Sequence, residues 1–102
     1  MKTGRLPFNN RPPKAAGPPA SELALRALAF LAQDEERAAR FLALTGLEGS
    51  EVRNLLGEPA FQLAVLDHLA GDEALLLAFV GAESLPPEVV GRARRALGGG
   101  EA

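Results

Sequence analysis

The chain has 102 residues, of which 47% are hydrophobic, and this length and composition predict a single folded domain. The absence of cysteine excludes disulfide bonds, a thiolate zinc site and a thiol nucleophile. No apolar run approaches the roughly 18 residues of a membrane-spanning helix, and residues 1–20 lack the apolar stretch of a signal peptide. We therefore expect a cytoplasmic protein that does not bind membranes.

The net charge of −2 conceals an uneven distribution of charges along the chain. Residues 1–21 contain four basic side chains and no acid, whereas residues 22–91 contain twelve acids and four arginines. Residues 92–102 contain three arginines and one glutamate. A basic arm beside an acidic body is typical of an interaction tail or of a segment that folds back loosely.

Residues 1–20 are predicted to form a disordered, basic arm, because five prolines and two glycines interrupt any regular structure. Only Leu6 and Phe8 offer apolar side chains of useful size. We interpret the arm as an inert linker, and the alternative is a short tether into an apolar groove.

The first half of the body predicts three helices. Apolar residues recur at helical spacing over residues 21–32, with Ser21 as the N-cap. Asp34 is the expected N-cap of a second helix, which Gly46 ends in a left-handed conformation. A short third helix should begin at Ser50, acting as its cap, and end near Leu56.

The second half predicts three more helices. Pro59 suits the first turn of a helix over residues 59–70, and Asp72 is the expected cap of the next one. That helix contains the run Leu75, Leu76 and Leu77, which is apolar in every direction. We expect it to be buried all round, either at the centre of the monomer or in a subunit contact. A last helix should have Pro87 at its first position and end at Leu97.

The two halves match each other at an offset of 38 residues. Nine of 32 positions are identical when residues 21–52 are laid over residues 59–90: Leu25/Leu63, Leu28/Leu66, Leu31/Leu69, Ala32/Ala70, Asp34/Asp72, Glu35/Glu73, Phe41/Phe79, Leu47/Leu85 and Val52/Val90. Two units are too few for an open helical array, whose end units need neighbours. We therefore predict an all-α, compact bundle of five to six short helices over residues 21–98. We interpret its two three-helix units as a pseudo-repeat, and we expect residues 99–102 to form a disordered tail.

Five segments resemble a family of small bacterial proteins of unknown function, common in alphaproteobacteria. The segments are 28–34, 40–47, 64–69, 72–79 and 93–98, so the similarity spans roughly residues 21–98. The matching positions are caps and core residues, and the family has no assigned catalytic residues. One departure is Pro86, which stands where the resemblance implies an Asp cap.

We predict no enzymatic activity and no catalytic, cofactor-binding or metal-binding residues. As a catalyst, His68, the one histidine, would need a nucleophile or an orienting carboxylate, but the adjacent Asp67 points elsewhere on the helix. With Asp72 alone, His68 falls short of a zinc site. We interpret His68 as a packing residue or one at the rim of the core. Asp34 and Asp72 occupy equivalent positions, but helix capping explains both without paired acid–base chemistry.

Our leading hypothesis is a small protein–protein interaction or regulatory module, with a second copy of itself as one option for its partner. The alternative is a nucleic-acid-associated accessory protein that uses the basic arm and the arginines of the last helix. We disfavour it because acids begin the helices that would face the phosphates. The candidate partner contacts are Arg37, Arg40, Arg92, Arg94 and Arg95.

Overall fold

The computed structural model describes residues 17–98, which form six helices and no strand. The helices are α1 (Ala20–Ala32), α2 (Glu35–Thr45), α3 (Gly49–Leu55), α4 (Pro59–Ala70), α5 (Glu73–Glu83) and α6 (Glu88–Ala96). The predicted all-α bundle is therefore confirmed. The expectations of disorder for residues 1–16 and 99–102 lie outside the described residues. Gly17 belongs to the folded part, because a Cβ placed on it would lie 3.1 Å from Val89.

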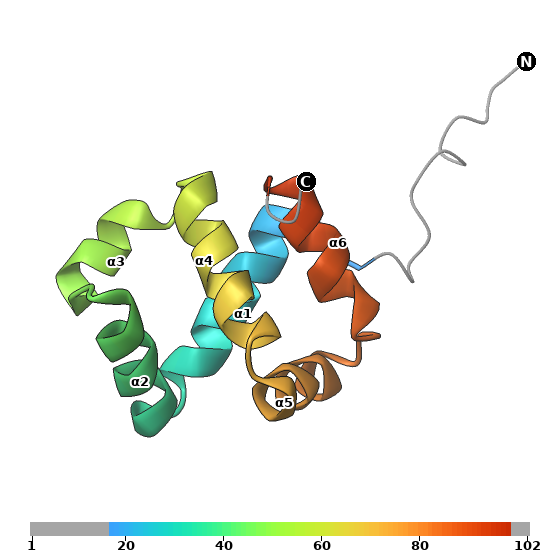
Figure 1. Ribbon diagram of the computed structural model, residues 1–102, viewed down its shortest axis with the longest axis horizontal. Coiled ribbons are helices and arrows are strands. Elements are labelled where there is room, and N and C mark those ends of the chain that lie inside the picture. Colours follow the sequence, from blue (N-terminus) through green and yellow to red (C-terminus); the bar gives the residue numbers. More distant parts are fainter. Residues whose placement is uncertain (1–16, 99–102) are drawn as a thin grey trace, which may run out of the picture.

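Helices α1 and α4 cross at the centre of the molecule, with α2 and α3 on one side and α5 and α6 on the other (Figure 1). Each central helix supplies at least four buried residues to one continuous core, including Leu23 and Leu31 of α1 and Leu66 and Leu69 of α4. The core is thus built along the line where the two three-helix units meet.

Two aromatic contacts join the units in an equivalent way. Phe30 of α1 meets Phe79 of α5 edge to face, with ring centroids 5.5 Å apart. His68 of α4 meets Phe41 of α2 in the same manner, with centroids 5.1 Å apart. The 38-residue offset converts one pair into the other. Each unit therefore lays its first helix on the second helix of the other unit, as in an approximate two-fold arrangement.

The predicted start and end of α2 and the predicted start of α5 are confirmed. The carboxylate of Asp34 accepts hydrogen bonds from the backbone N–H groups of Glu36 and Arg37, at 2.9 and 3.1 Å. Asp72 accepts one from the N–H of Leu75 at 3.1 Å. Gly46 has a φ of 76° and donates its N–H to the carbonyl of Leu42. These local signals act through hydrogen bonds within four residues, which explains why the sequence reveals them.

Three predicted helix starts are wrong. Pro19 precedes α1, and its carbonyl accepts from the N–H of Leu23, so Ser21 lies inside the first turn. Glu48 precedes α3 in an extended conformation, and its N–H donates to the Glu51 carboxylate at 2.8 Å, which places Ser50 inside the helix. Pro87 is the N-cap of α6 and not its first residue. In each case the helix begins one or two residues away from the expected position.

Of the two alternatives for α5, burial all round at the centre of the monomer is wrong. Leu75 is 9% exposed and packs in the core, but Leu77 is 48% exposed, and Leu76 is half-buried between them. Helix α5 is covered by α4 and, through Phe79, by α1. The buried residues of α5 are Leu75, Phe79 and Val80, and the opposite, apolar side of the helix faces solvent.

Candidate functional site

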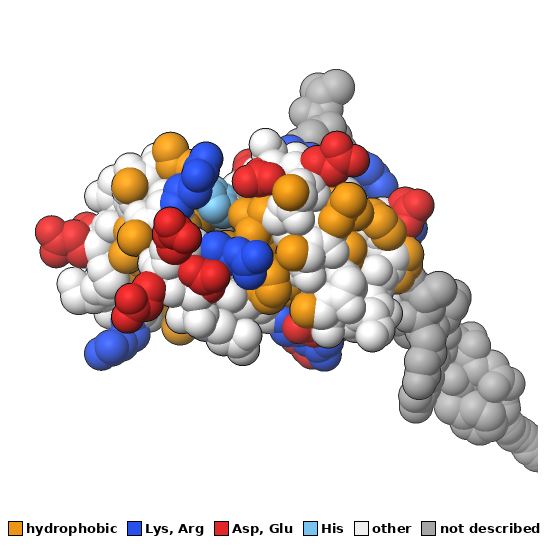
Figure 2. All heavy atoms as spheres, turned by 90° about the horizontal axis from the view of Figure 1, so that it is seen from below, with side chains coloured by type: hydrophobic (Ala, Val, Ile, Leu, Met, Phe, Trp, Pro, Cys, Tyr) orange, Lys and Arg blue, Asp and Glu red, His pale blue; other side chains and the backbone are white. Residues whose placement is uncertain are grey.

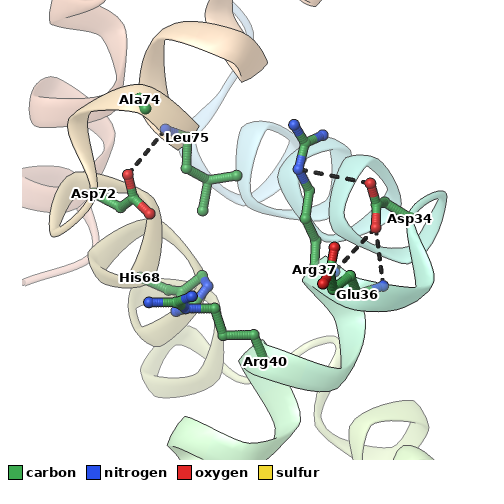
Figure 3. A pocket seen from close by; sticks show the side chains of 8 residues that line it. All are labelled: Asp34, Glu36, Arg37, Arg40, His68, Asp72, Ala74 and Leu75. Atoms are coloured by element: carbon green, nitrogen blue, oxygen red, sulfur yellow. Dashed lines mark hydrogen bonds and ion pairs between the residues drawn. The ribbon is translucent and has the colours of Figure 1, made fainter.

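A cleft of about 510 Å³ opens where the start of α2, the end of α4 and the start of α5 meet (Figure 3). Most of the side chains that line it are charged: Asp34, Glu36, Arg37, Arg40, His68, Asp72, Ala74 and Leu75. Several of them are equivalent under the 38-residue offset, namely Asp34 with Asp72, Glu36 with Ala74, and Arg37 with Leu75. The cleft therefore lies at the junction of the two units.

Arg37 is held in place from two directions. Its Nε lies 4.0 Å from the carboxylate of Asp34, and its guanidinium carbon lies 4.8 Å above the centroid of the Phe30 ring. A guanidinium over an aromatic face is attracted by the negative charge of the ring face. Arg37 of α2 is thus a cation held against α1 at one side of the cleft.

Arg40 has a different environment, because it forms no ion pair among the described residues. Its side chain extends toward His68 (Figure 3). A second hollow of about 510 Å³ continues beyond these two residues, and Arg40, His68 and Asp72 line both spaces. Leu44, which is 67% exposed, lines this second hollow. Arg40 consequently stands between two hollows with its charge available.

His68 lies at the rim of the core, as the sequence suggested. Partial burial lowers the pKa of the imidazole below its ordinary value of 6.5, and the positive charge of Arg40 lowers it further, while Asp72 opposes both effects. The lining residues of the cleft include no serine, threonine, cysteine, tyrosine or lysine, so the cleft contains no hydroxyl, thiol or amine nucleophile. Among the described residues, no group of three or more His, Cys, Asp and Glu side chains is placed to hold a metal ion.

The five candidate partner contacts do not form one surface. Arg37 and Arg40 meet in the cleft, whereas Arg92, Arg94 and Arg95 lie on α6 and line none of it. Arg94 donates to the carboxylate of Asp67 at 2.7 Å, so its charge already has a partner within the fold. The arginines of α6 are therefore less available as a group than the sequence suggested.

Sequence reasoning missed the exposed side of α5, which lies beside the cleft. Ala74, Leu77, Ala78 and Gly81 are all exposed, and they follow the spacing of one helix face. Hydrophobic side chains gather on the lobe formed there, next to His68 (Figure 2). The sequence does contain a signal for this exposed side, because positions 74, 77, 78 and 81 share one helix face and hold mostly small residues. Leu75 and Phe79 lie on the opposite side of the helix.

A family model described as "Protein of unknown function (DUF3572)" matches residues 18–100. No curated protein and no solved structure matches the chain. Within residues 17–98, none of the helices has both the length and the hydrophobicity to cross a bilayer by itself.

Proposed function

We propose that this chain, which belongs to the DUF3572 family of proteins of unknown function, is a non-catalytic protein–protein interaction module. Its docking surface is the α2–α5 face, defined as the cleft and the second hollow together with the exposed side of α5. This face comprises Glu36, Arg40, Leu44, Glu73, Ala74, Leu77, Ala78 and Gly81.

One observation carries the proposal: the solvent side of α5 is apolar throughout. No charged residue lies between Glu73 and Glu83, although five positions in this interval are exposed. Helices at the surface of globular proteins normally carry polar residues on the side that faces water. An exposed apolar helix side next to charged groups is typical of a surface that another protein covers.

The charged cleft supports the same conclusion by its position at the border of the apolar side. Protein interfaces commonly combine an apolar centre with a polar rim, and arginine is enriched among the residues that contribute most to binding. Arg40 fits this role because it is exposed and forms no ion pair among the described residues. Leu44 lines the second hollow together with Arg40, and Leu77 is the large exposed apolar side chain of α5.

The residues of the cleft favour recognition over catalysis. General acid–base catalysis requires a titrating group within hydrogen-bond reach of a reacting atom, usually together with a nucleophile or an orienting partner. His68 has a lowered pKa and packs on Phe41, and the lining contains no hydroxyl, thiol or amine nucleophile. We accordingly assign the cleft to binding.

Site-specific photo-crosslinking tests this proposal without knowledge of the partner. A photoreactive residue is placed at Leu77, at Leu44, or at Leu25, an exposed leucine of α1 outside the face, as the matched control. In the source cell we expect protein adducts from positions 77 and 44 that position 25 does not give. Equal adduct yields from all three positions would refute the α2–α5 face as a docking surface.

A further inference from the structure

We infer that the partner on the α2–α5 face is a second copy of this chain, packed with α5 against α5 about a two-fold axis. This inference rests on the proposed function and names the partner for the same face. It follows from three properties of the exposed side of α5.

The first property is that α5 carries both a projecting side chain and a set of small residues that can receive such a side chain. Residues at i, i+3, i+4 and i+7 surround the hole that receives one side chain of a facing helix. On α5 these positions are Ala74, Leu77, Ala78 and Gly81. Three are small, and Leu77 projects among them with 48% of its surface exposed. In an antiparallel pair, Leu77 of each copy packs over the small residues of the other.

The second property is that the protomer alone gives no reason for a glycine at position 81. Glycine lowers helix stability relative to alanine, and it is retained in helices mainly where another group approaches closely. A Cβ built on Gly81 would meet nothing within 4 Å. Close approach of a second helix supplies the missing reason.

The third property is that the border of the apolar side carries charges of both signs. Arg40 is a cation, Glu36 and Glu73 are anions, and none of them forms an ion pair among the described residues. A second copy brings the same mixture of charges to the contact, so each sign at this border has opposite charges available in the partner. A partner of a single sign would instead face repulsion from part of this border.

Two-fold contacts use the same patch on both subunits, and the patch must therefore complement itself in shape and charge. The α2–α5 face offers both a projecting leucine with small residues around it and charges of both signs. It also accounts for the apolar run of α5, of which the protomer core covers one side only.

Sedimentation equilibrium of the full chain, over a wide range of protein concentrations, tests this inference. We expect a species of twice 10.7 kDa that dissociates on dilution. Leu77→Arg and Ala78→Arg should each raise the dissociation constant by about tenfold or more, because each places a charge in the apolar centre of the contact. Leu25→Arg, on exposed α1 surface, is the matched control and should leave the constant unchanged.

Far-ultraviolet circular dichroism shows whether each variant is folded. If Leu77→Arg is not folded, Ala78→Arg is used in its place, since Ala78 is exposed. A parent protein of 10.7 kDa at every concentration would overturn the second copy as partner, as would a dimer insensitive to a folded variant of α5. If the parent is monomeric while position 77 crosslinks to a different protein, the proposed function stands and this inference fails. If position 77 gives no adduct, the proposed function fails.

Discussion

The two three-helix units share a plan but differ in how their third helices pack. Helix α6 contacts both central helices and buries Val89, Val90 and Ala93, whereas α3 has no buried residue. Under the 38-residue offset, Val89 corresponds to Glu51. A valine at this position widens the apolar stripe of α6, while a glutamate narrows that of α3. One change of residue type therefore helps to decide whether the third helix joins the core.

The same difference is visible in the space beneath the third helix. An apolar hollow of about 200 Å³ lies between α1, α2 and α3, and Leu28, Leu42 and Val52 line it while only partly buried. Their equivalents Leu66, Val80 and Val90 are at most 3% exposed. The second unit thus closes the space that the first leaves open. We conclude that the units contribute unequally to stability.

The largest effect should come from truncating equivalent leucines of the two units. Leu66→Ala should lower the free energy of unfolding by about 2–5 kcal/mol, because Leu66 is fully buried and a cavity remains. Leu28→Ala should cost clearly less, since Leu28 already borders the open hollow. Urea denaturation of both variants measures the difference. Equal losses would show that the first unit is as well packed as the second.

The packing difference should also appear in local stability. Amide hydrogens of α3 should exchange with solvent faster than those of α6, because α3 lacks buried side chains that would have to be exposed when it opens. Hydrogen–deuterium exchange followed by nuclear magnetic resonance resolves the two helices. Similar protection of α3 and α6 would contradict the comparison.

The two capping aspartates should have smaller and nearly equal effects. Asp34→Ala and Asp72→Ala should each cost about 1 kcal/mol, with the larger loss at Asp34, whose carboxylate accepts two hydrogen bonds where that of Asp72 accepts one. Asn variants are the controls, because an amide oxygen also caps a helix. Thermal denaturation measures both series. A loss well above 2 kcal/mol at either position would indicate a role beyond capping.

The smallest effect concerns His68, whose equivalent in the first unit is Phe30. Because the pKa of His68 is lowered in the folded state, the unfolded chain binds the proton more readily between that lowered pKa and 6.5. Stability should therefore decrease as the pH falls below 6.5, and His68 should contribute no pH dependence above it. In the His68→Phe variant, the urea midpoint should therefore fall less between pH 7 and pH 5 than it does in the parent protein. An identical pH dependence in the variant would mean that His68 titrates normally.

The amino-acid sequence by itself determined the helical class, the two-unit plan and the ends that depend on local hydrogen bonds. The caps at Asp34 and Asp72 and the left-handed Gly46 are examples, since their partners lie within four residues. The rim position of His68 was also predictable, because the offset places it over an apolar-face residue, Phe30.

Only the tertiary structure decided which side of α5 is covered, which charges meet and where the cleft opens. A run that is apolar in every direction has no periodicity to distinguish Leu75, which is in the core, from Leu77, which faces solvent. The partner of Arg94 is Asp67, 27 residues away, and no local rule indicates it. The cleft joins α2 to α4 and α5 because the two units pack across each other. Such contacts depend on the shape of the assembled core, whereas capping and periodicity act within a single helix.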